Sequence, residues 1–280
     1  MLTKHFITAG ILALILTSVL LGGCTQSENT AKLKVMTGTS LVTTIVEQIG
    51  GNHVEVFNLV PPSQHPGNFD VKPSDIQNLA AAKLLLTQGL PGETYIDNLV
   101  TSANNPNLTV VKANVAGNWM IPTIQSAAAD KVLLTLMDVD PDNTTDYQAA
   151  AVKYKQAITD KDTELRAKLV KANVAGINVI ASTRQADFLN WTGFNVVGTF
   201  DSATSLTPQA VKDLVDIGKA KNVKLVVNNL QDSEDAGKGI ASSIGANNIN
   251  LSNFPGGFSN TDTWAKAIDY NVNLLLNGIK

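Results

Sequence analysis

Residues 142–172 read DNTTDYQAAAVKYKQAITDKDTELRAKLVKA and contain neither glycine nor proline. Apolar side chains recur along this segment at spacings of three, four and seven residues, at Tyr147, Ala151, Tyr154, Ile158, Leu165 and Leu169. An α-helix turns once in about 3.6 residues, so these spacings place the side chains along one stripe. The pattern predicts one long helix that buries a single face.

On both sides of this helix, short apolar runs alternate with helical segments. Before it, we predict strands at residues 33–37, 54–60, 84–87 and 108–111, and helices at residues 40–49, 72–82 and 95–102. After it, we predict strands at residues 178–181, 195–197 and 224–227, and helices at residues 208–219, 233–244 and 263–276. Such alternation favours parallel sheets covered by helices. The predicted fold class is therefore α/β, with an N-terminal lobe (33–141), a linking backbone helix (142–173) and a C-terminal lobe (174–280).

The N-terminus indicates the compartment. Residues 1–23 begin with a positive charge and continue in a nearly unbroken apolar run from Phe6 to Leu21, as is typical of a secretory signal peptide. The run ends in Leu-Gly-Gly-Cys24, which matches the lipobox of bacterial and archaeal lipoproteins, and Cys24 is the only cysteine. We predict that Cys24 is acylated and that residues 24–32 form a polar tether. The alternative is an ordinary signal peptide, or a short anchor helix, followed by an unmodified cysteine.

Composition excludes two classes of function. The formal net charge is −3 and no basic cluster occurs, which argues against nucleic acid as a partner. Only His53 and His65 remain after processing of the signal peptide, and neither lies near a nucleophile-elbow pattern. A Ser-His-Asp set therefore cannot be assembled, and we predict that the chain is not an enzyme.

Several short motifs occur in the order found in one family. They are Gly50-Gly51 before Val54-Glu55-Val56, Pro61-Pro62, Pro73-Ser74-Asp75, Trp119-Met120-Ile121-Pro122, and Asp140-Pro141-Asp142-Asn143 before the long helix. With them, residues 33–280 resemble the ABC-transporter solute-binding lipoproteins that import zinc and manganese. The resemblance implies two α/β lobes bridged by a rigid helix, a ligand cleft between the lobes, and a membrane permease as partner. It also implies a divalent metal, zinc or manganese, as the bound species.

The resemblance further implies four metal-ligand positions, and none of them holds its usual donor. The first and second histidines fall on Gly67 and Gly117. The third ligand, a histidine or glutamate, falls on Arg184 or Gln185, and the last, an aspartate, falls on Asn253. Zinc takes about four protein ligands in a closed site, and an arginine adds a charge that repels the cation. We expect that the chain does not bind a bare metal ion in the family's usual way.

Two side chains near these positions allow alternative interpretations. His65 is either a displaced metal ligand, acting with Asp70 or with a residue of the other lobe, or an exposed loop histidine. It is the only metal ligand that we consider in the cleft. Trp119 either stacks on a ligand or packs in the core, and we favour packing.

Arg184 is a candidate for ligand binding because its planar fork recognises carboxylate, phosphate or a chelated anionic complex. The alternative is a surface arginine paired with Asp187 or Asp201. The predicted cleft residues are Thr39, Ser40, His65, Gly67, Asn68, Trp119, Arg184 and Asn253. This set suits a small polar or anionic solute, or a metal already held by a chelator.

We therefore predict a monomeric, extracytoplasmic lipoprotein, anchored in the lipid bilayer through Cys24, at the cell surface or in the periplasm. It would bind its ligand for an ABC importer of the zinc and manganese class and deliver it to the permease. The alternative is an adhesin or interaction lipoprotein on the same scaffold.

Overall fold

The computed structural model describes residues 31–90, 93–202, 205–233 and 235–280. The predicted signal peptide, Cys24 and most of the predicted tether lie outside these residues. Lys32–Lys280 form one compact unit. No helix in the described ranges has the length and apolarity needed to cross a membrane.

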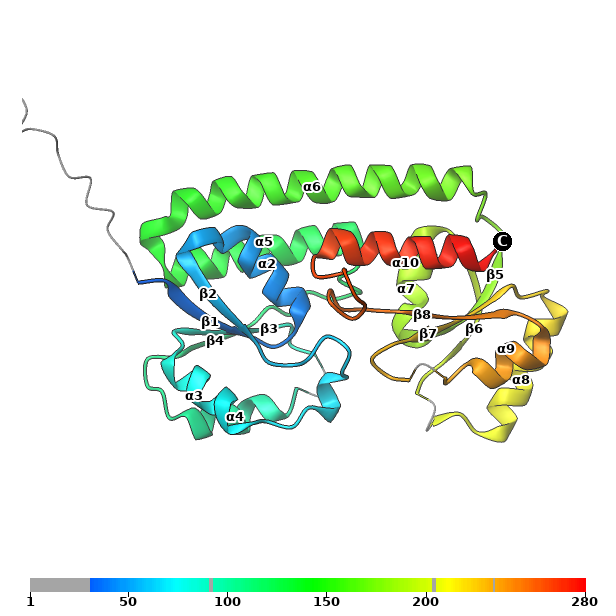
Figure 1. Cartoon of the computed structure of the whole chain (residues 1–280), viewed down its shortest axis with the longest axis horizontal. Coiled ribbons are helices and arrows are strands. Elements are labelled where there is room, and N and C mark those ends of the chain that lie inside the picture. The colour runs from blue at the N-terminus through cyan, green and yellow to red at the C-terminus, as the bar shows by residue number, and fades with distance from the viewer. Residues whose placement is uncertain (1–30, 91–92, 203–204, 234) are drawn as a thin grey trace, which may run out of the picture. The chain divides into compact units, whose positions relative to one another are not determined.

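The N-terminal lobe contains a parallel sheet of four strands in the order β2-β1-β3-β4. Its elements in chain order are β1 (Leu33–Thr37), α2 (Ser40–Gly50), β2 (Val54–Asn58), α3 (Pro73–Ala81), β3 (Leu84–Thr87), α4 (Tyr95–Ala103), β4 (Thr109–Lys112) and α5 (Pro122–Val139) (Figure 1). The sequence analysis predicted all of these except α5. It had also extended β2 to residue 60, two residues beyond its end.

The long helix α6 (Thr144–Lys171) follows a 3-10 turn at Pro141–Asn143 and runs along α5 and α10 (Figure 1). Its buried residues are the six that the spacing predicted, from Tyr147 to Leu169. The prediction of one long helix with a single buried face is confirmed.

The C-terminal lobe repeats the topology of the first, with the strand order β6-β5-β7-β8 and parallel pairing. Its elements are β5 (Asn178–Ser182), α7 (Thr183–Thr192), β6 (Asn195–Phe200), α8 (Pro208–Ala220), β7 (Leu225–Asn229), α9 (Lys238–Ile244), β8 (Asn247–Leu251) and α10 (Trp264–Gly278). The predicted α/β class with two lobes is confirmed. The sequence analysis missed α7 and β8, and it started α9 at residue 233, whereas the helix begins at Lys238.

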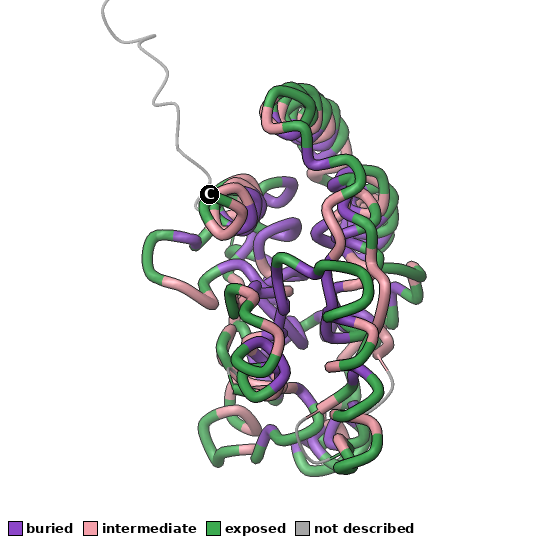
Figure 2. Tube along the Cα trace, turned by 90° about the vertical axis from the view of Figure 1, so that its right-hand side faces the viewer, coloured by how far each residue is buried: buried purple, intermediate pink, exposed green. Residues whose placement is uncertain are grey.

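Alternate residues of the inner strands face two different cores, as the period of two in a β-strand requires. In β7, Leu225 and Val227 belong to a core shared with α5, α6, α7 and α10, while Val226 faces the side covered by α8 and α9. In β3, Leu85 likewise faces α3 and α4. Figure 2 shows buried positions inside and exposed positions along the outer sides of the helices. The shared core joins both lobes to α6.

In each sheet, the connections that leave the two inner strands run in opposite directions across the sheet. The resulting switch points lie between β1 and β3 and between β5 and β7. In open parallel sheets, ligands bind beyond the carboxyl ends of the strands at such points. The segments after these strands are therefore the expected place for a site in each lobe.

Candidate functional site

A cavity of about 260 Å³ lies between the two lobes. Every segment that lines it follows the carboxyl end of a strand or begins a helix there. The lining residues are Leu41, His65, Pro66, Gln88, Leu90, Gly117, Asn118, Trp119, Thr183, Arg184, Asp187, Asn229, Gln231, Asn253 and Phe254. This cavity therefore collects residues next to, or at, all four positions where the family resemblance places metal ligands.

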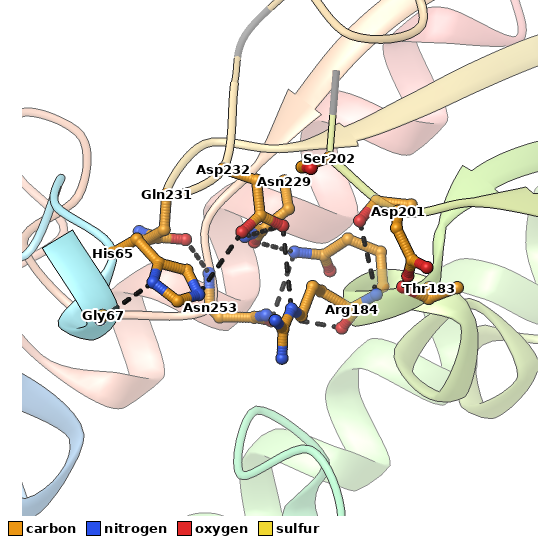
Figure 3. Close-up of polar contacts among 12 residues, drawn as sticks. His65, Gly67, Thr183, Arg184, Asp201, Ser202, Asn229, Gln231, Asp232 and Asn253 are labelled. Atoms are coloured by element: carbon orange, nitrogen blue, oxygen red, sulfur yellow. Dashed lines mark hydrogen bonds and ion pairs between the residues drawn. The ribbon is translucent and has the colours of Figure 1, made fainter. Parts of the chain in front are cut away.

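Asp232, which follows β7, is approached from both lobes at the cavity. His65 Nε2 lies 3.6 Å from Asp232 Oδ1, and Arg184 Nε lies 3.8 Å from Asp232 Oδ2 (Figure 3). The Asp232 side chain is 10% exposed, and Asn229 Nδ2 donates to it at 3.0 Å. Asp232 is thus the partner of Arg184, whereas the sequence analysis had considered Asp187 or Asp201. Asp201 accepts a hydrogen bond from Thr183 Oγ1 instead.

Carboxamide side chains form a second connection between the lobes. Asn253 Oδ1 accepts hydrogen bonds from Asn118 Nδ2 at 2.9 Å and from Gln185 Nε2 at 3.1 Å. Asn118 Nδ2 also donates to the backbone oxygen of Arg184, and Gln185 Nε2 also donates to Asn229 Oδ1. Carboxamides can both donate and accept, so this network holds the lobes together with protein atoms alone.

Three further hydrogen bonds join the lobes around the cavity. Ser40 Oγ donates to the backbone oxygen of Pro255 at 2.7 Å, and Gln231 Nε2 donates to that of Pro62 at 2.7 Å. Trp264 Nε1 donates to the backbone oxygen of Trp119 at 3.1 Å. The cavity is therefore bordered on several sides by direct contacts between the lobes.

Some of the predicted cleft residues lie elsewhere. Thr39 is fully buried and donates to Gln88 Oε1 at 2.8 Å, and Ser40 is engaged with Pro255. Neither lines the cavity, and neither do Gly67 and Asn68, which are the exposed residues of the 3-10 turn Pro66–Asn68.

The two remaining predicted side chains lie at the cavity wall. His65 is 25% exposed there and is not simply a solvent-exposed loop residue. Trp119 is 2% exposed and belongs to the shared core, with Nε1 donating to the Val115 backbone oxygen at 2.9 Å. Packing is therefore its main role, although one part of it borders the cavity.

The donor set in the cavity does not fit a bare zinc or manganese ion. His65 Nδ1 accepts a hydrogen bond from the Gly67 backbone N–H at 2.9 Å, so in a neutral ring Nε2 carries the proton and faces Asp232. Both lone pairs of Asn253 Oδ1 are used by protein donors. Across the described ranges, no group of three or more His, Cys, Asp or Glu side chains is placed to hold a metal ion.

A buried carboxylate shapes the loop after β3. Glu93 Oε2 accepts hydrogen bonds from the backbone N–H groups of Gly89 at 3.0 Å and Leu90 at 3.1 Å. Burial raises the pKa of Glu93, and these hydrogen bonds oppose the rise. The contact holds the turn that presents Gln88 and Leu90 to the cavity.

A model of the family "Zinc-uptake complex component A periplasmic" matches residues 35–278. The chain belongs to this family. It is 23% identical over 276 residues to the manganese-binding lipoprotein MntA of Halalkalibacterium halodurans, covering 90% of each chain. The fold matches a crystal structure of ZnuA with a TM-score of 0.77 and 20% identity, over 89% of this chain and 100% of that one. It matches a manganese-bound periplasmic metal-binding protein of Candidatus Liberibacter asiaticus with a TM-score of 0.77 and 17% identity, over the same shares.

The family supplies solute-binding components of ABC importers for metal ions, and it is not a family of enzymes. The resemblance that the motifs indicated is confirmed, as is the prediction that the chain is not an enzyme. Its relatives are named for zinc, manganese or iron.

Sequence reasoning missed Asp232, Asn118, Asn229 and Gln231. Asn229, Gln231 and Asp232 lie at or just after the end of β7, a strand that the sequence predicted up to residue 227. The rule that ligands bind beyond strand ends could have selected them. Asn118 lies beside Gly117, so attention to the neighbour of a lost ligand could have found it.

We expect the change Asn118→Ala to lower the free energy of unfolding by about 1–3 kcal/mol. The change removes the hydrogen bonds from Asn118 Nδ2 to the Arg184 backbone oxygen and to Asn253 Oδ1, and it removes the acceptor of the Met120 backbone N–H. Urea unfolding followed by circular dichroism measures the loss. The exposed Asn190, on α7, supplies the control Asn190→Ala. Equal losses in the two variants would contradict a bridging role for Asn118.

Proposed function

We propose that this chain is the lipid-anchored, extracytoplasmic solute-binding component of an ABC importer, and that it delivers an organic or chelated ligand to a membrane permease as a monomer. Membership of the family supports the importer. The match to MntA, which is named a lipoprotein, agrees with the lipobox at Cys24. The proposed cargo differs from the bare metal ions that the family resemblance implies.

The observation that carries the proposed cargo is the carboxamide bridge at the position of the missing metal ligands. Asn253 stands where the resemblance places an aspartate, and its oxygen is bound by Asn118 and Gln185. The third ligand position falls on Arg184, a permanent cation, or on its neighbour Gln185, a neutral carboxamide that is already bound to Asn253 and Asn229. A cavity of about 260 Å³ adjoins these residues, which is far more space than a metal ion held directly by protein ligands requires. A small organic solute, or a metal inside an anionic chelator, suits this space better than a bare ion.

Native mass spectrometry of the protein purified from its own source tests this proposal. Residues 25–280, expressed in that source behind a cleavable secretory signal peptide, include the whole compact unit Lys32–Lys280 and lack the predicted lipidation site Cys24. We expect a non-covalent adduct that is lost under denaturing conditions and whose mass is that of an organic molecule or a chelate. An adduct with the mass of one zinc or manganese ion alone would overturn the proposed cargo.

Stimulation of the transporter's ATP hydrolysis is the second test of the proposed function. The purified protein, added to membrane vesicles that contain a candidate permease and ATPase from the same source, is expected to stimulate ATP hydrolysis in the presence of the identified ligand. A protein that carries no ligand and stimulates no transporter would overturn the importer assignment and favour an interaction lipoprotein.

A further inference from the structure

Two oppositely charged residues of α7 line the cavity, Arg184 in the first turn of the helix and Asp187 in the second. Arg184 and Asp187 are separated by three positions, which places them on neighbouring parts of the same helix face. Both line the cavity and both are exposed. No ion pair within 4.0 Å joins them, so each keeps its charge available to a ligand.

The guanidinium of Arg184 has N–H donors available for a ligand. Its side chain is 57% exposed, and the nearest carboxylate oxygen, on Asp232, lies 3.8 Å from Nε, which is longer than a hydrogen bond. Within the described residues, no hydrogen bond occupies its two terminal nitrogens. These nitrogens form the flat edge of the guanidinium that binds a carboxylate through two parallel hydrogen bonds. Figure 3 shows the guanidinium below Asp232 and beside Asn253, with its terminal nitrogens turned away from Asp232.

Asp187 also lacks a protein partner among the described residues, whereas Asp232 does not. Asp232 is 10% exposed and is bound by Asn229, with His65 and Arg184 nearby. The charges left for a ligand are therefore one cation at Arg184 and one anion at Asp187. A purely anionic ligand would meet the repulsion of Asp187, and a purely cationic ligand would meet that of Arg184.

One side of the cavity wall is largely apolar. Leu41, Pro66, Leu90, Trp119 and Phe254 contribute to it. The volume of about 260 Å³ lies below the range of about 300–1,000 Å³ that is typical of sites for drug-sized ligands. The ligand is therefore small, and an apolar group on it would be removed from water against this wall.

We infer that the ligand is a small zwitterion of amino-acid size with an apolar side group. Its carboxylate binds the terminal nitrogens of Arg184, its ammonium group binds Asp187, and its side group lies against Leu90 and Phe254. This inference rests on the proposed function, since it specifies the organic ligand of the same cleft.

Calorimetric titration of residues 25–280 with the twenty amino acids, each added separately, is the test. We expect at least one apolar amino acid to bind. Its analogue without the amino group and its analogue without the carboxylate are each expected to bind at least about 10-fold more weakly, because each loses one charged contact. For leucine these analogues are 4-methylpentanoate and 3-methylbutylamine.

Variants separate the two contacts. Arg184→Gln and Asp187→Asn are each expected to weaken binding of the amino acid at least about 10-fold. Asp187→Asn should strengthen binding of the analogue without an amino group, because it removes the repulsion between Asp187 and the carboxylate, and a merely structural role would not produce opposite effects on the two ligands. The control is Asp97→Asn, at an exposed acid on α4. Unchanged thermal unfolding shows that each variant is folded.

The outcomes distinguish this inference from the proposed function. Equal affinities for the amino acid and for its analogue without the amino group would overturn the inference that the ligand is a zwitterion. Binding of no amino acid, with a different organic adduct in native mass spectrometry, would also overturn it while leaving the proposed function intact. The absence of any organic or chelated ligand in both experiments would overturn both.

Discussion

We expect the combined changes Gly67→His, Gly117→His, Arg184→His and Asn253→Asp to raise the affinity for Zn²⁺ at least about 100-fold. The changes place imidazole or carboxylate at the four positions where the family resemblance implies metal ligands. They also remove the guanidinium charge of Arg184, and Asp at position 253 cannot donate to the Arg184 backbone oxygen as Asn253 does. Competition with a zinc-sensitive dye measures the affinity.

The same four changes are expected to lower the free energy of unfolding of the metal-free variant. Gly117 has a φ of +101°, where a side chain is strained, and a Cβ there would lie 3.2 Å from Ile124 Cδ1. A Cβ at position 67 would lie 3.0 Å from His65 Nδ1, so the His65 ring would have to turn away. We expect a loss of about 1–3 kcal/mol from the strained backbone, recovered when zinc is added.

The matched control carries alanine at the same four positions. It suffers similar backbone strain and loses the same arginine, but it gains no donors. If the alanine variant bound zinc as tightly as the histidine and aspartate variant, the assignment of the four positions would be wrong.

We expect Trp264→Ala to lower the free energy of unfolding by about 3–5 kcal/mol. Trp264 is 2% exposed, begins α10 and lies in the core that the two lobes share. Its Nε1 also donates to the backbone oxygen of Trp119 in the other lobe. This tryptophan therefore lies at the joint between the two lobes.

Trp264→Phe separates the two contributions. Phenylalanine keeps most of the apolar contact but cannot donate, so we expect a smaller loss, with the hydrogen bond contributing about 1 kcal/mol. Urea unfolding monitored by circular dichroism gives both values. A loss below about 1 kcal/mol for Trp264→Ala would show that the joint does not depend on this side chain.

The fold was predictable where hydrophobic periodicity is strong. The six apolar residues of α6 define its buried face without any other information. In contrast, α7 follows β5 directly, so no linker separates the two elements, and its first residues, from Thr183 to Asp187, are mostly polar. The strand β8 reads Asn-Asn-Ile-Asn-Leu, and asparagine is disfavoured in strands. Its pairing with β7 at the sheet edge overrides that preference.

The site was predictable only where the family motifs provided positions. Gly117, Arg184 and Asn253 line one cavity, and they are three of the residues on which the family resemblance places metal ligands. The carboxamide bridge was not predictable, because Asn118 and Asn253 are far apart in sequence and meet only when the lobes pack. The same holds for Asp232, whose contacts with His65 and Arg184 come from three separate segments.

Calorimetric titration of residues 25–280 with Zn²⁺ and then with Mn²⁺ is the most direct test of the claim that the cleft does not bind a bare metal ion. We predict no sub-micromolar binding of either ion, because the cavity lacks the necessary donors and is bridged by carboxamides. Sub-micromolar binding of one ion per chain, abolished by His65→Ala or Asn253→Ala, would contradict the account.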